Sequence, residues 1–151
     1  SDVCSSDLSL LGTDERYLKA ADMSFDNVAV IVAIDTLSFD IPRVMTELGS
    51  FIERRHHAII FGEDEEVWSA ASPITYVAAG KNIPAFALMY VADSEATSVQ
   101  TKAFAKALAA AKVEAILIPG NEKTAKTIDE ELGRADDPST RALITFIRLK
   151  I

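Results

Sequence analysis

Three short apolar runs divide the chain, and helical patterns lie between and after them. The runs cover residues 28–34, 85–91 and 113–118, and the first two contain no charged residue. Runs of this length without polar alternation are typical of strands that are buried on both faces of a parallel sheet. We therefore predict an α/β fold with about three parallel strands, flanking helices and right-handed crossovers, in which residues 28–34 form a central strand.

Helical periodicity is clearest between residues 98 and 112 and after residue 138. The first of these segments places a row of apolar residues on one face: Val99, Ala103, Phe104, Ala107, Leu108 and Ala111. The second does the same with Ala142, Leu143, Phe146 and Ile147. Pro42 suits the first position of a helix that we expect to continue to about Arg55. Shorter helices are predicted at residues 13–21 and 124–132, and one that begins at the acidic residues 63–66.

Two of the predicted strands end on an aspartate, Asp35 in one case and Asp93 in the other. In open α/β sheets, ligands bind and chemistry takes place beyond the carboxyl ends of the strands. Asp93 is therefore a candidate catalytic or binding carboxylate. The alternative interpretation is that Asp93 closes a loop or caps the helix that follows it.

Composition limits the classes of partner. The chain has 151 residues, 49% of them hydrophobic, which fits one globular domain or a large part of one. Its net charge of −8 disfavours nucleic acid and anionic membrane surfaces as partners. No apolar run approaches the ~20 residues of a membrane span. Cys4 is the only cysteine, so an internal disulfide is excluded. We expect a soluble protein, with the cytoplasm as its default compartment.

Residues 1–8 show no periodicity and are similar to the translation of a sequencing-adapter fragment. We expect them to be a non-native tail, with the native sequence beginning at Ser9 inside a longer protein. The alternative is an ordinary polar N-terminal tail. From Ser9 onward the pattern indicates the end of one helix, a stop at Gly12, and a short helix capped by Thr13 or Asp14.

Motifs for metals and nucleotides are incomplete. His56 and His57 are adjacent, so on a helix their side chains diverge by about 100° and cannot chelate one metal ion as an i, i+4 pair would. We expect them at a solvated helix end. The segment from Gly120 to Thr124 lacks the second glycine of a phosphate-binding loop, and no Gly-x-Gly-x-x-Gly is present. No cofactor or metal is predicted.

Several short motifs occur in order along residues 9–151. They are Leu11-Gly-Thr-Asp-Glu-Arg-Tyr-Leu18, Phe61-Gly62, Trp68-Ser-Ala-Ala-Ser-Pro-Ile-Thr75, Ile83-Pro84, Val91-Ala-Asp93, Lys123-Thr-Ala-Lys-Thr-Ile128, Leu132-Gly133 and Asp137-Pro138. Together they resemble the C-terminal half of α/β-hydrolase esterases, most closely the carboxylesterase and arylformamidase-like branch. The resemblance implies a truncated α/β-hydrolase whose parent hydrolyses a small carboxylic ester or related amide through a covalent acyl-enzyme.

In that family the catalytic triad follows the chain order serine, acid, histidine. The resemblance places Asp93 on the acid position. The Gly-x-Ser-x-Gly turn that carries the serine is absent here, and Ala125 occupies the position of the histidine, between Lys123 and Thr127. The nearby Lys126 is a poor general base because an ordinary lysine is protonated at neutral pH. We therefore expect this chain to be inactive.

Two other classes of function stay open. The chain could belong to a non-catalytic α/β-hydrolase homologue that acts as a binding or scaffolding protein, or it could be a self-contained small α/β domain of the flavodoxin or receiver type. The hydrolase interpretation adds a physical prediction. Residues 28–34 would lack a neighbouring strand, and the exposed apolar sheet edge would favour self-association.

Overall fold

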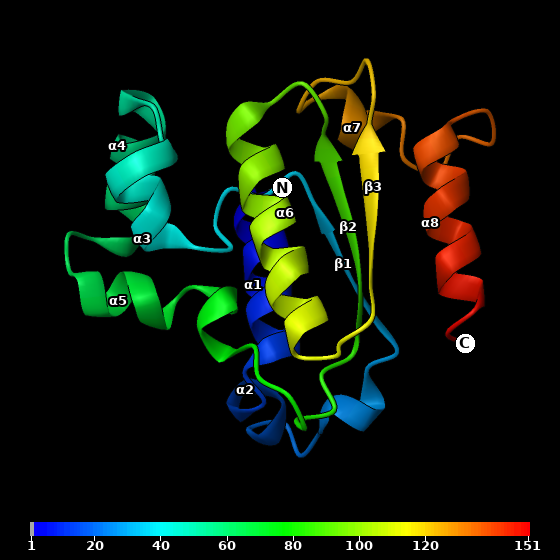
Figure 1. Ribbon diagram of the computed structural model, residues 1–151, viewed down its shortest axis with the longest axis horizontal. Coiled ribbons are helices and arrows are strands. Elements are labelled where there is room, and N and C mark those ends of the chain that lie inside the picture. Colours follow the sequence, from blue (N-terminus) through cyan, green and yellow to red (C-terminus); the bar gives the residue numbers. More distant parts are fainter. Residues whose placement is uncertain (1) are drawn as a thin grey trace.

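The computed structural model describes residues 2–151, and its centre is a three-stranded parallel sheet (Figure 1). The strands are β1 (Val30–Ile34), β2 (Ala85–Val91) and β3 (Ala115–Gly120), in the spatial order β1-β2-β3. The predicted α/β class with three parallel strands is confirmed. The predicted central position of residues 28–34 is wrong, because β2 pairs on both sides and β1 lies at an edge.

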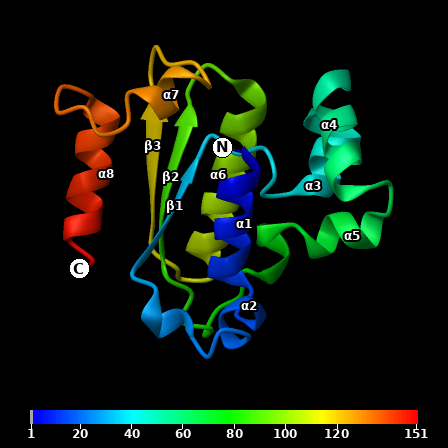
Figure 2. The ribbon, with the colours of Figure 1, turned by 180° about the vertical axis from the view of Figure 1, so that it is seen from behind.

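Helices cover both faces of this sheet. Helices α1 (Asp2–Thr13) and α6 (Glu95–Ala110) lie on one face, and α8 (Pro138–Arg148) lies on the other (Figures 1 and 2). Alternate residues of β2 point to the two faces. Accordingly Phe86 and Leu88 join one hydrophobic core with Phe104 of α6, whereas Met89 joins a second core with Leu143 of α8. Strand β2 is thus buried on both sides, as its apolar sequence predicts, whereas β1 is half-buried on one face and β3 exposes Leu117 and Pro119.

The first helix approaches the sheet closely at Gly12. A Cβ atom at this position would lie 2.6 Å from the Cγ1 atom of Ile31 in β1, so only glycine permits this packing. Helix α1 ends one residue later than the predicted stop, and the short helix α2 (Arg16–Lys19) follows. The helix to which residues 9–13 belong begins at Asp2, so it includes most of the octapeptide that we expected to be a non-native tail.

The helix predicted from Pro42 to about Arg55 is wrong in its bounds. A short helix α3 (Ile41–Arg43) passes into a π-helical turn, η2 (Val44–Leu48), and the chain is extended at Gly49. Helix α4 (Phe51–Phe61) then begins anew, because Ser50 and Glu53 form a capping box in which each side chain accepts a hydrogen bond from the other residue's backbone N–H.

The remaining elements are short. Helix α5 (Glu65–Ala70) is capped by Asp64 and starts in the acidic run, as predicted. Helix α7 (Thr127–Glu130) lies inside the predicted segment 124–132. Single 3₁₀ turns occur at η1 (Phe25–Asn27) and η3 (Pro73–Tyr76). Within residues 2–151, none of the helices has both the length and the apolar character that crossing a membrane requires.

Helix α6 begins earlier than predicted, and its buried face differs from the expected one. Phe104 and Leu108 are fully buried as expected, but the amino-terminal half of the helix buries polar side chains. The Gln100 amide explains part of this pattern, because it donates to the Asp40 carbonyl and accepts from the Asp40 N–H, both at 2.9 Å. Gln100 therefore holds the segment between β1 and α3 through hydrogen bonds, and Phe104, one turn later, holds the same segment by stacking on Phe39.

Candidate functional site

The carboxyl ends of the three strands meet at one edge of the sheet (Figure 1). Asp35 follows β1, Asp93 lies two residues after β2, and the loop of residues 121–126 follows β3. The register places Val91 beside Gly120, so the turn that carries Asp93 and the β3–α7 loop leave the sheet from adjacent positions. This edge is where a parallel sheet assembles a functional site.

Asp35 is fully engaged by the neighbouring strand. Its backbone N–H donates to the Met89 carbonyl at 2.8 Å, and its Oδ1 accepts from the Val91 N–H at 2.9 Å. The residue has φ +47°, a left-handed conformation that aspartate tolerates better than most residues. The side chain thus substitutes for a backbone acceptor at the end of the sheet, and its role is to join β1 to β2.

Asp93 has the opposite environment. Its side chain is exposed, and among residues 2–151 nothing donates a hydrogen bond to it or pairs with it. The turn around it is fixed from both sides, because Ala92 N–H donates to the Gly120 carbonyl and Ser94 N–H to the Val91 carbonyl, each at 3.2 Å. Asp93 does not cap α6, whose N-cap residue is Ser94. A fixed backbone therefore presents a free carboxylate.

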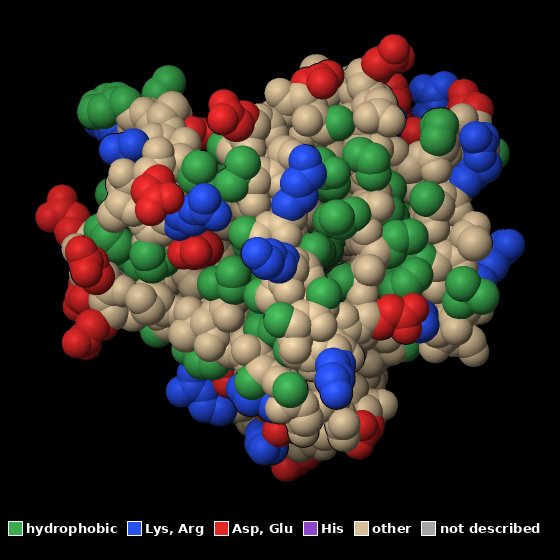
Figure 3. All heavy atoms as spheres, viewed as in Figure 1, with side chains coloured by type: hydrophobic (Ala, Val, Ile, Leu, Met, Phe, Trp, Pro, Cys, Tyr) green, Lys and Arg blue, Asp and Glu red, His purple; other side chains and the backbone are tan. Residues whose placement is uncertain are grey.

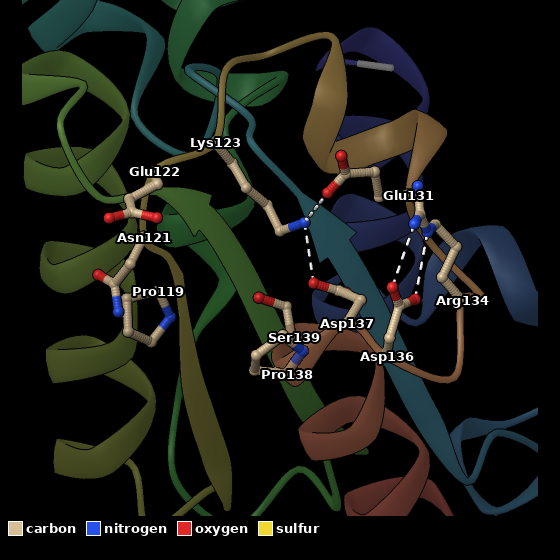
Figure 4. Close-up of a pocket in the computed structure, with 10 residues that line it drawn as sticks. All are labelled: Pro119, Asn121, Glu122, Lys123, Glu131, Arg134, Asp136, Asp137, Pro138 and Ser139. Atoms are coloured by element: carbon tan, nitrogen blue, oxygen red, sulfur yellow. Dashed lines mark hydrogen bonds and ion pairs between the residues drawn. The ribbon is translucent and has the colours of Figure 1, made fainter.

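The β3–α7 loop contains a buried ion-pair cluster (Figure 4). Lys123 Nζ lies 2.8 Å from Asp137 Oδ1 and 2.6 Å from Glu131 Oε2, and the Lys123 and Asp137 side chains are only 8% and 5% exposed. Asp137 Oδ2 also accepts from the backbone N–H and the hydroxyl of Thr140, both at 2.7 Å, which caps α8. The cluster joins the loop to the beginning of the last helix.

The pKa values of this pair reflect their mutual contact. Burial alone would raise the pKa of Asp137, but the hydrogen bonds from Lys123 and Thr140 together outweigh burial and lower it from 3.8 to about 2. The hydrogen bonds to Asp137 and then Glu131 raise the pKa of Lys123. Lys123 therefore stays protonated at neutral pH and cannot act as a general base.

A polar hollow of about 510 Å³ opens beside this cluster. Its lining residues, which Figure 4 labels, come from the end of β3, the β3–α7 loop, the α7–α8 connection and the start of α8: Pro119, Asn121, Glu122, Lys123, Glu131, Arg134, Asp136, Asp137, Pro138 and Ser139. Both cations are already paired, Lys123 as above and Arg134 with Asp136 at 3.1 Å. Within residues 2–151, no three histidine, cysteine or acidic side chains are arranged to hold a metal ion.

Ala125 lies exposed in the middle of the same loop. Lys126 beside it faces solvent and makes only a loose ion pair with Glu130 at 3.6 Å. The structure therefore brings the turn of Asp93 and the loop of Ala125 to one edge of the sheet, but the side chains of that loop include no histidine to accept a proton.

His57 lies elsewhere, and the expectation of a solvated helix end is wrong for it. It is in the middle of α4 and 3% exposed, whereas His56 is exposed. The new helix start at Ser50 places His57 inside a helix instead of at its end, on the side that contacts Ser38. That capping box is visible in the sequence as Ser50-x-x-Glu53 and was the missed signal.

His57 forms a buried pair with Ser38. Its Nε2 lies 3.0 Å from Ser38 Oγ, and its Nδ1 lies 2.9 Å from the Glu53 carbonyl oxygen. Because a carbonyl can only accept, Nδ1 carries the proton in the neutral ring and the Ser38 hydroxyl donates to Nε2. The distance suits a nucleophile and base, but both side chains are buried without room for a substrate. The pair fastens α4 to the segment after β1.

Comparison of the chain with protein-family models, curated proteins and solved structures gives no match in any of the three.

Proposed function

We propose that residues 9–151 are the C-terminal portion of an α/β-hydrolase domain of the carboxylic-ester or arylformamide hydrolase kind, in which Asp93 is the acid of the triad. The observation that carries the proposal is the free carboxylate of Asp93 beside the β3–α7 loop at the carboxyl edge of the sheet. The motifs quoted above provide the family, and the three parallel strands are consistent with it.

The chemistry assigns distinct work to each member of such a triad. Serine is a weak nucleophile until histidine removes its proton, and the acid orients the histidine and stabilises the imidazolium that forms. This chain contributes the acid, and Ala125 occupies the histidine position. The buried His57 and Ser38 are committed to each other. The chain is therefore proposed to be inactive by itself toward the small ester or amide that the intact parent would accept.

Sequencing the gene upstream of the codon for Ser9 tests this proposal. We expect a Gly-x-Ser-x-Gly shortly before Leu10 in place of the octapeptide, and a His-Gly-Gly loop further upstream. In the whole protein, Ala125→His should then raise hydrolysis of an activated phenyl ester by roughly a hundredfold or more, and adding Asp93→Asn should remove most of that gain. A gene that encodes the octapeptide and no such serine turn would overturn the assignment.

The second candidate is a non-catalytic hydrolase homologue that binds a ligand or partner. It is favoured by Ala125. The β3–α7 loop, where the family has the catalytic histidine, has alanine at that position, although the buried ion pair between Lys123 and Asp137 is intact. An upstream turn in which serine is replaced by another residue would support this candidate. A Gly-x-Ser-x-Gly with serine present would favour a degraded enzyme instead.

The partner that we propose for this chain is a second copy of itself, which associates through the edge of β1. The backbone of Asp35 bonds to β2, and alternate residues of a strand direct their backbone groups to opposite sides. Ile34, Val32 and Val30 therefore direct theirs away from β2, toward the open edge. Ser5 Oγ from α1 engages both Ile34 N–H at 3.0 Å and Ile34 C=O at 3.2 Å. Val30 and Val32 form the remaining edge, and Val32→Lys should weaken association through it because a charge on an edge strand opposes pairing.

A further inference from the structure

Helix α4 carries its hydrophobic face on the outside of the molecule. Phe51 and Ile52 are both 78% exposed and Ile59 is 75% exposed, whereas His57 on the opposite side is buried. The helix belongs to a lobe of α3, α4 and α5 that stands away from the sheet, and hydrophobic side chains project from the outer end of this lobe (Figures 1 and 3). An amphipathic helix normally packs such a face against the rest of the protein. Here the apolar side chains of this face are exposed to solvent.

The exposed face of α4 has a regular order of side-chain types. An apolar pair, Phe51 and Ile52, is followed one turn later by the basic residues Arg55 and His56, and one turn later again by the apolar pair of residues 59 and 60. Gly62 then ends the helix, and the acidic run of residues 63–66 follows, all of it exposed. Residues four apart share one side of a helix, so residues 51–60 of this order lie along a single surface, and the acidic run follows at its end.

We propose that a second copy of this chain docks on α4, with the two α4 helices antiparallel and crossing at Ile59 and Ile60. A two-fold interface uses the same patch on both subunits, so a patch must be complementary to itself. Crossing at Ile59 and Ile60 places apolar side chains against each other. It also brings Arg55 and His56 of each copy toward the end of the other α4, where the acidic run follows Gly62.

The order of charges selects this crossing point over the alternative. A crossing at Arg55 and His56 would also pair apolar residues, Ile52 with Ile59, but it would bring the basic residues of the two copies together. Like charges at the centre of an interface oppose association.

Other occupants fit this surface less well. An anionic membrane would meet the acidic run of residues 63–66 and a chain with net charge −8. The edge of β1 is a different surface on another element, so an α4 interface does not depend on the hydrolase assignment or on the proposed edge contact. His57 and Ser38 hold α4 in place from behind, which gives the interface a fixed shape.

Sedimentation equilibrium of the purified chain, wild type and variants, tests the proposal. We expect the wild type to dimerise in the micromolar range and Ile59→Glu to raise the dissociation constant by at least roughly tenfold. Leu149→Glu is the matched control, because Leu149 has the same 75% exposure but lies at the end of α8. The proposal is overturned if the wild type is monomeric, if both variants weaken association equally, or if only Val32→Lys does so.

A charge exchange tests the crossing point. Arg55→Glu should weaken the dimer, and adding Glu63→Lys should restore it, because the exchanged charges again face each other across the two-fold axis. Failure of the second change to rescue the first would overturn this crossing. Binding of the wild type to anionic phospholipid vesicles without any self-association would assign the surface to a membrane and overturn the proposal.

Discussion

The turns after β1 and β2 start from the same sequence pattern and end in opposite states. Each strand is an apolar run that is followed within two residues by an aspartate. Asp35 comes directly after β1, and Asp93 lies two residues after β2. The Asp35 carboxylate accepts a hydrogen bond from the Val91 N–H of the neighbouring strand, whereas the Asp93 carboxylate faces solvent. The first aspartate maintains the sheet, and only the second remains available to a substrate or to another side chain.

The difference follows from position in the sheet. Strand β1 is at the edge and ends opposite Met89, so β2 extends past it and offers an N–H that the ladder no longer satisfies. Asp93 follows the longer central strand, and Ala92 N–H already bonds to β3. A strand end therefore has a spare carboxylate only where the backbone groups of its neighbours are satisfied without it.

The largest loss of stability is expected from breaking the buried ion pair in the loop after β3. Lys123→Met should lower the free energy of unfolding by about 3 kcal/mol, the low end for a broken buried pair, because Asp137 would lose its ammonium partner. Urea unfolding followed by circular dichroism measures this change. Lys126→Met on the same loop is the control, since its exposed pair should contribute no more than about 0.5 kcal/mol. Equal effects of the two changes would contradict the conclusion that the buried pair of Lys123 and Asp137 stabilises the fold more than the exposed pair of Lys126 and Glu130 does.

Asp35→Ala should destabilise the protein by about 2 kcal/mol, because the Val91 N–H would lose its acceptor and alanine is strained at positive φ. Asp35→Asn keeps an acceptor oxygen and tolerates this backbone, so it should be nearly neutral. Hydrogen exchange at the Val91 amide provides a local measurement. Faster exchange in the alanine variant alone is expected, and unchanged exchange would show that the bond does not hold the two strands together.

The pH dependence of stability should identify the paired carboxylate. Because the pKa of Asp137 is lowered from 3.8 to about 2 in the folded protein, its contribution is present above pH 4 and is lost as the pH falls toward 2. The difference in stability between wild type and Asp137→Asn should therefore shrink over this range. A difference that stays constant from pH 5 to the lowest pH at which both proteins fold would contradict the lowered pKa.

Asp93→Ala should have the smallest effect on folding. The side chain has no partner among the described residues, so the free energy of unfolding should change by less than about 0.5 kcal/mol. Thermal and urea unfolding beside the Asp35 variants measure the contrast directly. Destabilisation as large as that of Asp35→Ala would mean that Asp93 is a structural residue and would remove the basis for a catalytic role.

Local sequence patterns predicted the elements that depend on local physics. The apolar runs became the three strands, and the Asp64 cap with its acidic turn began α5. One error arose where a competing local signal was missed, the capping box at Ser50 that starts α4 anew and places His57 inside it. Part of the buried face of α6 could not be predicted, because Gln100 is buried by a contact with Asp40, 60 residues away.

The sequence by itself determined the α/β class, the two strands that end on aspartate, and the absence of histidine from the loop that contains Ala125. Only the tertiary structure decided which aspartate is free, which histidine is buried, and which helix face is left uncovered. The physical reason is that each of these depends on contacts between distant segments, such as the bond that joins Asp35 to Val91 across 56 residues. Residue types and spacing fix what a side chain can do, and its neighbours in space fix whether it remains available to do it.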